Sequence, residues 1–78
     1  MSDQPDPLQW FRDLVATLSG KELEVLILAA NGLTNKEIAG QIHRSPHTIN
    51  EHMVSIFKKL EVNTRAEAAV IAAKAGIV

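Results

Sequence analysis

The chain has 78 residues, no cysteine and a formal net charge of −1 at pH 7. A chain of this length forms one small domain, and the lack of cysteine excludes disulfides and thiolate metal sites. No apolar run approaches the roughly 18 residues of a membrane-spanning helix and no basic-then-apolar leader opens the chain, which predicts a cytoplasmic protein without a membrane partner.

Charge is distributed unevenly along the chain. Residues 1–24 contain five acidic and two basic side chains, whereas residues 25–78 contain six basic and four acidic ones. All three histidines also lie in the second part. A nucleic-acid-binding module usually has a basic excess, so the overall charge argues mildly against DNA while the C-terminal part favours it.

The N-terminal extension, residues 1–17, is predicted to hold a short amphipathic helix. Asp6 is suited to cap it and Pro7 to occupy its first position, where a missing N–H costs nothing. Apolar residues then recur at helical spacing from Phe11 to Leu18. A disordered leader is the alternative, and it would leave Trp10 and Phe11 without a role.

The second predicted helix begins at Ser19, forms a capping box with Glu22 and ends at Asn31-Gly32. It carries two apolar stripes on nearly opposite sides, which predicts burial on both. The stripes are Val25, Leu26 and Ala29 on one side and Leu23, Ile27 and Ala30 on the other. The N-terminal segment is expected to cover the second stripe with Trp10, Phe11 and Leu14.

Two further helices are predicted on either side of a tight turn. Thr34 with Glu37 forms a capping box at the start of a short helix, and Ser45 followed by Pro46 begins a longer one. A short helix, a tight turn and a longer helix constitute the helix-turn-helix arrangement, in which the second helix enters the DNA major groove. Residues 46–60 are therefore the predicted recognition helix.

The last predicted helix begins at Thr64, with Glu67 completing a capping box, and runs to about Ala75. It is apolar on almost all sides, which predicts two buried faces. The core is expected to take Ala68, Ile71, Ala72 and Ala75. A symmetric dimer interface is expected to use Ala66, Val70, Ala73 and Ile77, unless these form an ordinary alanine-rich surface. The capped helices together predict an all-α bundle.

The outer face of the recognition helix supplies the candidates for base contact. Residues spaced by three, four and seven positions share one helix face, and these are His47, Asn50, Glu51 and Val54. Asparagine suits adenine, glutamate can accept from the cytosine amino group, and valine can touch a thymine methyl. The alternative is that the row is simply the solvated side of a surface helix.

A second set of side chains is predicted to contact DNA phosphates. The start of the short helix is favourable because free N–H groups and the helix dipole attract an anion there. The set comprises Asn35, Lys36, Ser45, Thr48, His52, Lys58 and Lys59. Structural alternatives exist, because Ser45 also caps a helix and Lys58 and Lys59 suit the C-terminal end of the dipole.

Neither a metal site nor an enzymatic activity is predicted. His43 lies in the turn, so it should not converge with His47 and His52 on one face. The sequence offers no nucleophile–base pair, glycine-rich phosphate loop or paired carboxylates, and no cofactor is expected.

Several motifs in order along the chain resemble a known family. They are Leu18-Ser19 with Glu22, Glu24-Val25-Leu26, the run from Gly32 to Ala39, Ser45 with Thr48-Ile49 and His52, and Lys59-Leu60 with Val62. Residues 18–78 thereby resemble the LuxR/NarL/FixJ-type (GerE-like) helix-turn-helix domain of bacterial transcription regulators. The resemblance implies a four-helix domain with its third helix in the major groove and its fourth at a dimer interface. It also implies that Asn50, Glu51 and Val54 reach base edges.

The leading hypothesis is a bacterial transcription regulator that binds double-stranded promoter DNA at an inverted repeat, as a homodimer, with RNA polymerase left open as a further partner. The alternative is a helix-turn-helix protein-interaction module that antagonises another regulator or a polymerase subunit. Near-neutral charge and the apolar Leu23 and Ile27 favour the alternative, whereas Lys36, Lys58 and Lys59 favour DNA.

Overall fold

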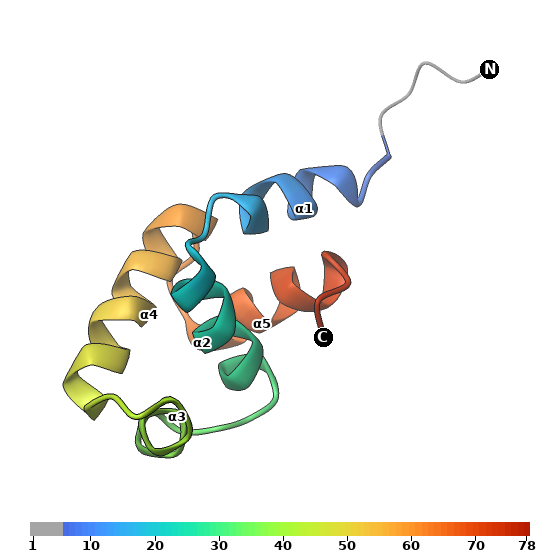
Figure 1. The fold of residues 1–78 in the computed structure, drawn as a ribbon. Helices are drawn as coiled ribbons and strands as arrows, with labels where there is room; N and C mark the ends of the chain where they lie inside the picture. Colours follow the sequence, from blue (N-terminus) through green and yellow to red (C-terminus); the bar gives the residue numbers. More distant parts are fainter. Residues whose placement is uncertain (1–5) are drawn as a thin grey trace.

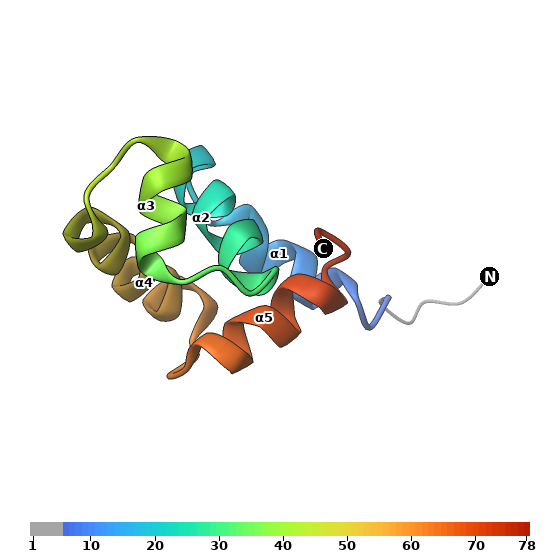
Figure 2. The ribbon, with the colours of Figure 1, turned by 90° about the horizontal axis from the view of Figure 1, so that it is seen from below.

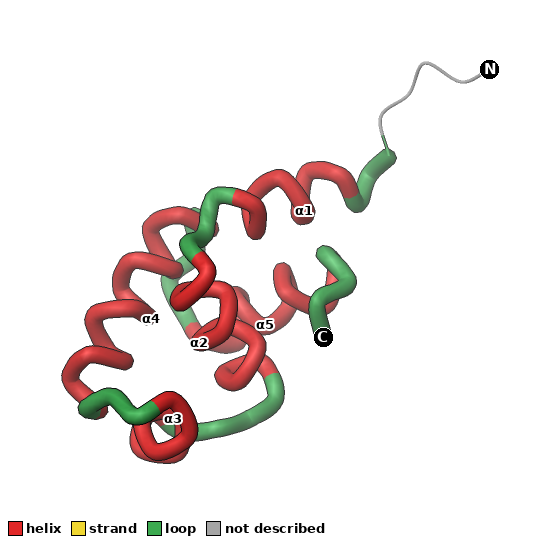
Figure 3. The backbone as a smooth tube through the Cα atoms, viewed as in Figure 1, coloured by secondary structure: helices red, strands yellow, loops and turns green. Residues whose placement is uncertain are grey.

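The computed structural model describes residues 6–78, and that part of the chain is folded into five helices joined by short loops (Figures 1 and 3). The helices are α1 (Gln9–Ala16), α2 (Gly20–Ala30), α3 (Asn35–Ile42), α4 (Pro46–Leu60) and α5 (Arg65–Lys74). The predicted all-α fold, with a four-helix domain and a short additional N-terminal helix, is confirmed. Within residues 6–78 no helix has the length and apolarity needed to cross a membrane.

Four helices begin at the predicted N-cap residues. Ser19 and Thr34 each form a complete capping box, in which the hydroxyl oxygen accepts a backbone N–H and the glutamate accepts the N–H of the cap residue. Ser45 accepts the N–H of Thr48 and is followed by Pro46 in the first turn. The predicted box at Thr64 is incomplete, because its partner glutamate accepts the threonine hydroxyl rather than the backbone N–H.

Helix α1 begins later than predicted. Asp6 and Pro7 belong to a turn, which is closed by the Gln9 N–H donating to the Asp6 carbonyl at 2.9 Å. The Asp6 carboxylate accepts the Leu8 N–H, also at 2.9 Å, so it stabilises the turn before α1 and does not cap the helix itself. The first helical residue is therefore Gln9 rather than Pro7.

Two helix ends turn through left-handed residues that are not glycine. His43 ends α3 with φ 55°, and Glu61 ends α4 with φ 58°. At each end a backbone N–H returns to the last turn, from Arg44 to the Ala39 carbonyl and from Val62 to the Phe57 carbonyl, both at 3.0 Å. These bonds satisfy carbonyls that the helix leaves open. Residues 43–45 thus make a short turn that fixes the direction in which α4 leaves α3.

The core lies around α2, which contacts α3, α4 and α5 (Figure 2). Its Val25 and Leu26 are fully buried, and Ala29 completes the predicted stripe. The other helices contribute Ile38, Ala39, Ile49, Met53, Ile56, Leu60, Ala68, Ile71, Ala72 and Ala75. Burial of such side chains contributes roughly 1.5–3 kcal/mol for each large one, so this cluster determines the relative placement of α3 and α4.

The prediction that α1 covers the second stripe of α2 is wrong. Helix α1 packs against α5 and α4 instead, with Val15 buried and Phe11 and Leu14 partly buried. Trp10 is 57% exposed and touches Phe11 edge-on, with ring centroids 5.0 Å apart. The Lys74 ammonium at the end of α5 lies 5.0 Å from the centroid of the Phe11 ring, so the end of α5 borders this side of α1.

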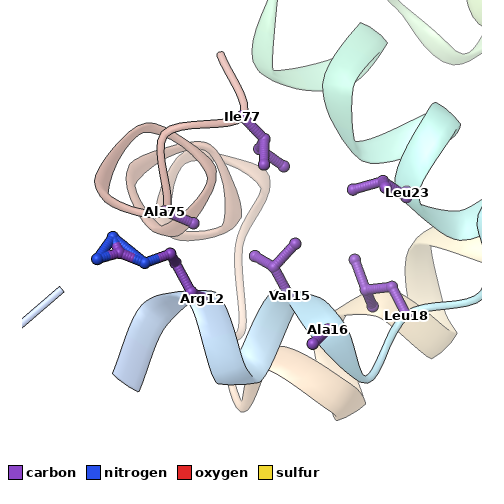
Figure 4. A pocket seen from close by; sticks show the side chains of 7 residues that line it. All are labelled: Arg12, Val15, Ala16, Leu18, Leu23, Ala75 and Ile77. Atoms are coloured by element: carbon purple, nitrogen blue, oxygen red, sulfur yellow. The ribbon is translucent and has the colours of Figure 1, made fainter. Parts of the chain in front are cut away.

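A cavity of about 390 Å³ remains between α1, the start of α2 and the end of α5 (Figure 4). Its lining consists of Arg12, Val15, Ala16, Leu18, Leu23, Ala75 and Ile77. Leu23 and Ala30 of the second stripe still pack against the core, whereas Ile27 remains partly exposed.

Candidate nucleic-acid interface

Helix α4 separates an apolar inner face from an open outer face. Ile49, Met53, Ile56 and Leu60 are buried, and Phe57 is partly buried. The four candidates for base contact, His47, Asn50, Glu51 and Val54, are all exposed. Val54 is 49% exposed. The N-terminal end of α4 and helix α3 lie at the opposite end of the molecule from the start of α1 (Figure 1).

The outer face of α4 has only one interaction of its own among residues 6–78. His47 Nε2 lies 3.5 Å from Glu51 Oε1, so the two form an ion pair when the histidine is protonated. Asn50 makes no side-chain hydrogen bond within the described part of the chain. Its amide is therefore free to donate and accept at the same time, as bidentate recognition of adenine requires.

The start of α3 carries a free cation and free backbone donors. Lys36 is exposed and forms no ion pair with a carboxylate of residues 6–78. The backbone N–H groups of Asn35 and Lys36 have no acceptor in the same part of the chain, as is usual for a first helical turn. Glu37 lies beside them, and hydrogen bonds from Thr34 hold the pKa of its carboxyl below the ordinary value.

Asn35 is partly buried and differs from Lys36 in having a partner. Its Oδ1 accepts a hydrogen bond from Arg65 Nη2, and Arg65 Nη1 donates to the Leu33 carbonyl at 2.8 Å. Neither interaction was predicted, since Arg65 is 30 residues away in the sequence.

The start of α4 contains the remaining predicted phosphate contacts. The Ser45 and Thr48 hydroxyls lie 3.0 Å apart, and Ser45 is also the helix cap. Thr48 and His52 are partly buried on one flank of α4. Arg44, which the sequence analysis did not include, is exposed in the turn and has no carboxylate partner among residues 6–78. A basic residue inside the turn of a helix-turn-helix motif was the signal that would have identified it.

The two lysines near the end of α4 have different environments. Lys58 is exposed and forms no ion pair within residues 6–78, whereas the Lys59 ammonium donates to Glu22 Oε1 of α2 at 2.7 Å. Glu22 is only 5% exposed, and it also accepts the Ser55 hydroxyl and the Ser19 N–H. Burial alone would raise the pKa of Glu22, but these hydrogen bonds, with Lys59 first, lower it to about 2. Lys59 is thus engaged with α2 rather than free for a phosphate.

The four predicted dimer residues do not share one exposed surface. Ala66, Val70 and Ala73 are exposed on α5, and Val70 is 52% exposed. Ile77 lies beyond the end of α5, packs against the core and lines the cavity beside α1 (Figure 4). It therefore does not share the exposed face, because the left-handed Gly76 turns the chain back before it.

Residues 6–78 contain no group of three histidine, aspartate or glutamate side chains placed to hold a metal ion. His43, His47 and His52 are distributed over the turn and two sides of α4.

Comparison of the sequence with known proteins identifies the family. Residues 16–72 match the model of the GerE family, described as bacterial regulatory proteins of the luxR family. The transcriptional regulatory protein LiaR of Bacillus subtilis (strain 168) is 43% identical over 56 residues, which is 72% of this chain and 26% of that protein.

The response regulator protein VraR of Staphylococcus aureus (strain Mu3 / ATCC 700698) is 38% identical over 60 residues, which is 77% of this chain and 29% of that protein. The chain therefore spans less than a third of the length of these relatives. The family match covers all of α2, α3 and α4 and most of α5. The chain belongs to the luxR family of bacterial regulatory proteins.

Proposed function

We propose that the chain binds double-stranded DNA sequence-specifically and regulates transcription, with α4 in the major groove. The observation that carries the proposal is the exposed row on α4 of a helix-turn-helix motif, flanked by basic side chains that have no carboxylate partner among residues 6–78. Family membership supports the same function, since the family consists of bacterial regulatory proteins.

Base readout is assigned to the outer face of α4. Asn50 is the proposed partner of an adenine, and Val54 the proposed contact to a thymine methyl. Glu51 would accept from a cytosine amino group, and His47 Nε2 lies 3.5 Å from its carboxylate. Because the side chains lie on one exposed face, they can meet neighbouring base edges together.

Phosphate contacts are assigned to groups on both sides of the turn. Lys36, Arg44 and Lys58 supply charge, and the free N–H groups at the start of α3 supply neutral donors. Asn35, Ser45, Thr48 and His52 complete the proposed set. Such contacts set the position of α4 on the duplex and make affinity depend on salt, without specifying sequence.

The assembly is proposed to be a homodimer in contact through the outer face of α5. Ala66 and Ala73 are small enough for close helix approach, and the exposed Val70 lies between them. A two-fold symmetric pair would read two half-sites of an inverted repeat in a promoter. Transcription regulation at such a site brings the protein into the neighbourhood of RNA polymerase, in the bacterial cytoplasm.

The DNA-binding proposal is tested by selecting sites from a random duplex library and measuring affinity by fluorescence anisotropy over a salt series. Val54→Glu should weaken binding to the selected site by more than about tenfold, because it places a carboxylate at a base edge. The matched control is Val78→Glu, since Val78 is 48% exposed and lies far from α4 in the sequence. A wild-type chain that selects no duplex, even at low salt, would reject DNA binding and favour the protein-interaction alternative.

The dimer proposal has its own test. Val70→Glu should shift the chain toward monomer in analytical ultracentrifugation and reduce binding to a full inverted repeat more than to a single half-site. An equal loss on both duplexes would contradict contact through α5.

A further inference from the structure

Arg65 connects two segments that are far apart in the sequence, the start of α5 and the start of α3. It is the first residue of α5, and its guanidinium donates to the Leu33 carbonyl and to Asn35 Oδ1. Leu33 ends the loop before α3, and Asn35 is the first residue of α3. The start of α5 is thereby fixed to the start of the helix that precedes the turn.

The chemistry of this contact determines the orientation of the Asn35 amide. A guanidinium has only donors, so the amide atom that faces it must be the carbonyl oxygen. The other end of the amide is then the NH₂ group, which only donates. A side chain that could present either end to a ligand is in this way restricted to presenting a donor, the group that a phosphate oxygen requires.

The charge of Arg65 is not cancelled locally. The guanidinium forms no ion pair with a carboxylate of residues 6–78, and its two partners are neutral carbonyl oxygens. The guanidinium is therefore committed to neutral acceptors at the start of α3, one of which is the Asn35 amide oxygen.

We propose that Arg65 is a positioning residue for DNA binding, which orients the Asn35 amide as a phosphate donor and holds the start of α3 against α5. The inference rests on the proposed function, because it assigns a role within the same interface. Arg65 does not itself need to reach the DNA, and its effect on affinity passes through Asn35.

A double-mutant cycle tests this role with the full chain and the selected half-site duplex. Arg65→Met removes both donors and the charge but keeps the aliphatic stem. It should weaken binding about five- to tenfold in the wild-type background and less than about twofold when Asn35→Ala is already present. The control cycle pairs Arg65→Met with Lys58→Ala at the other end of α4, where the two effects should multiply.

A second variant keeps the test valid if Arg65→Met fails to fold. Asn35→Asp preserves the contact with Arg65 as an ion pair but replaces the outward donor by an acceptor. Its melting temperature should be unchanged or raised, while its affinity for the half-site falls at least fivefold. Asn63→Asp adds the same charge at an exposed loop residue just before α5, and it should reduce affinity less than Asn35→Asp does.

Two outcomes would overturn the inference while leaving the proposed function intact. The first is an equal loss of affinity for Arg65→Met in the wild-type and Asn35→Ala backgrounds. The second is an Asn35→Asp chain that binds as tightly as the Asn63→Asp control. Failure of the wild-type chain to bind any duplex would instead contradict the proposed function itself.

Discussion

Helix α4 has polar groups on two sides, and the two sides differ in whether those groups have partners. On one flank, Ser55 and Lys59 are bonded to the buried Glu22 of α2. On the outer face, Asn50 has no partner and Glu51 has only a histidine neighbour within residues 6–78. The same helix thus carries one set of polar groups whose hydrogen bonds are made within the protein and a second set, on the outer face, that is available to a ligand.

The groups bonded to Glu22 should contribute mainly to the stability of the fold, and the groups on the outer face of α4 mainly to the proposed recognition of DNA. A buried carboxylate with several charge-assisted hydrogen bonds contributes to the folded state and has little capacity left for a ligand. Exposed groups without partners contribute little to folding, so they can be changed with small effects on stability and large ones on binding. Substitutions on the two sides of α4 should therefore give opposite patterns of effect.

The largest expected effect is a loss of stability in Glu22→Ala. The substitution leaves the Lys59 ammonium and the Ser55 hydroxyl without their acceptor, and it removes half of the capping box at Ser19. The free energy of unfolding, measured in urea, should fall by about 3 kcal/mol. Glu24→Ala removes an exposed pair with Lys21 and should cost less than about 0.5 kcal/mol. An equal loss of unfolding free energy in Glu22→Ala and Glu24→Ala would show that the hydrogen bonds of the buried Glu22 contribute no more than an exposed ion pair.

Acid should lower the free energy of unfolding by protonating Glu22, the carboxylate that accepts from Ser55 and Lys59. The pKa of Glu22 is lowered from 4.5 to about 2 in the folded protein, so its contribution is present above pH 4.5 and is lost as the pH falls toward 2. Between pH 7 and pH 3 the loss should be about 2 kcal/mol by linkage. The check is urea unfolding of wild type and Glu22→Gln across this range, in which the gap between them should narrow with acid. A gap independent of pH would show that Glu22 does not titrate as assigned.

On the open side, Asn50→Ala should leave stability nearly unchanged and alter sequence preference. The loss of a bidentate contact should relax selectivity at one base position by about 1–2 kcal/mol. Competition binding with single-base variants of the selected site measures it. If affinity falls equally for every variant, Asn50 contacts the backbone rather than a base.

The smallest effect distinguishes two of the three lysines that were predicted to contact phosphates, Lys36 and Lys59. Lys36→Ala should lower the slope of log affinity against log salt by about one unit, as expected for one lost phosphate contact. Lys59→Met should leave the slope unchanged and lower the melting temperature, because its ammonium is bonded to Glu22. A reduced slope for Lys59→Met would place this lysine at the DNA backbone after all.

Most helix starts could be predicted because capping is local chemistry. Ser19, Thr34 and Ser45 each bond to a residue three positions later, so the signal and its partner lie in the same short window. Helix α1 was predicted to begin two residues too early, at Pro7 instead of Gln9, because Asp6 closes a turn with Leu8 and Gln9 before the helix begins. The buried residues of α4, Ile49, Met53, Ile56 and Leu60, recur at intervals of three or four, so this stripe is a local feature of the sequence as well.

Contacts between distant residues could not be predicted in the same way. An apolar stripe indicates that a surface will be covered but not by which element, so the partner of α1 was assigned to α2 instead of α5. Lysines 58 and 59 look alike in the sequence, and only the position of Glu22, 37 residues from Lys59, distinguishes them. The Arg65–Asn35 contact was missed for the same reason.

The turn at residues 43–45 has a thermodynamic consequence. His43 holds a left-handed conformation that a non-glycine residue adopts only when its surroundings impose it, and α4 is fixed behind it by the fully buried Ile49 and Ile56. Because α4 is already packed into the core, the proposed binding of DNA by α4 should not carry the entropy loss of folding a segment. The heat-capacity change of binding should accordingly match the surface removed from water at the contact, with no added contribution from coupled folding.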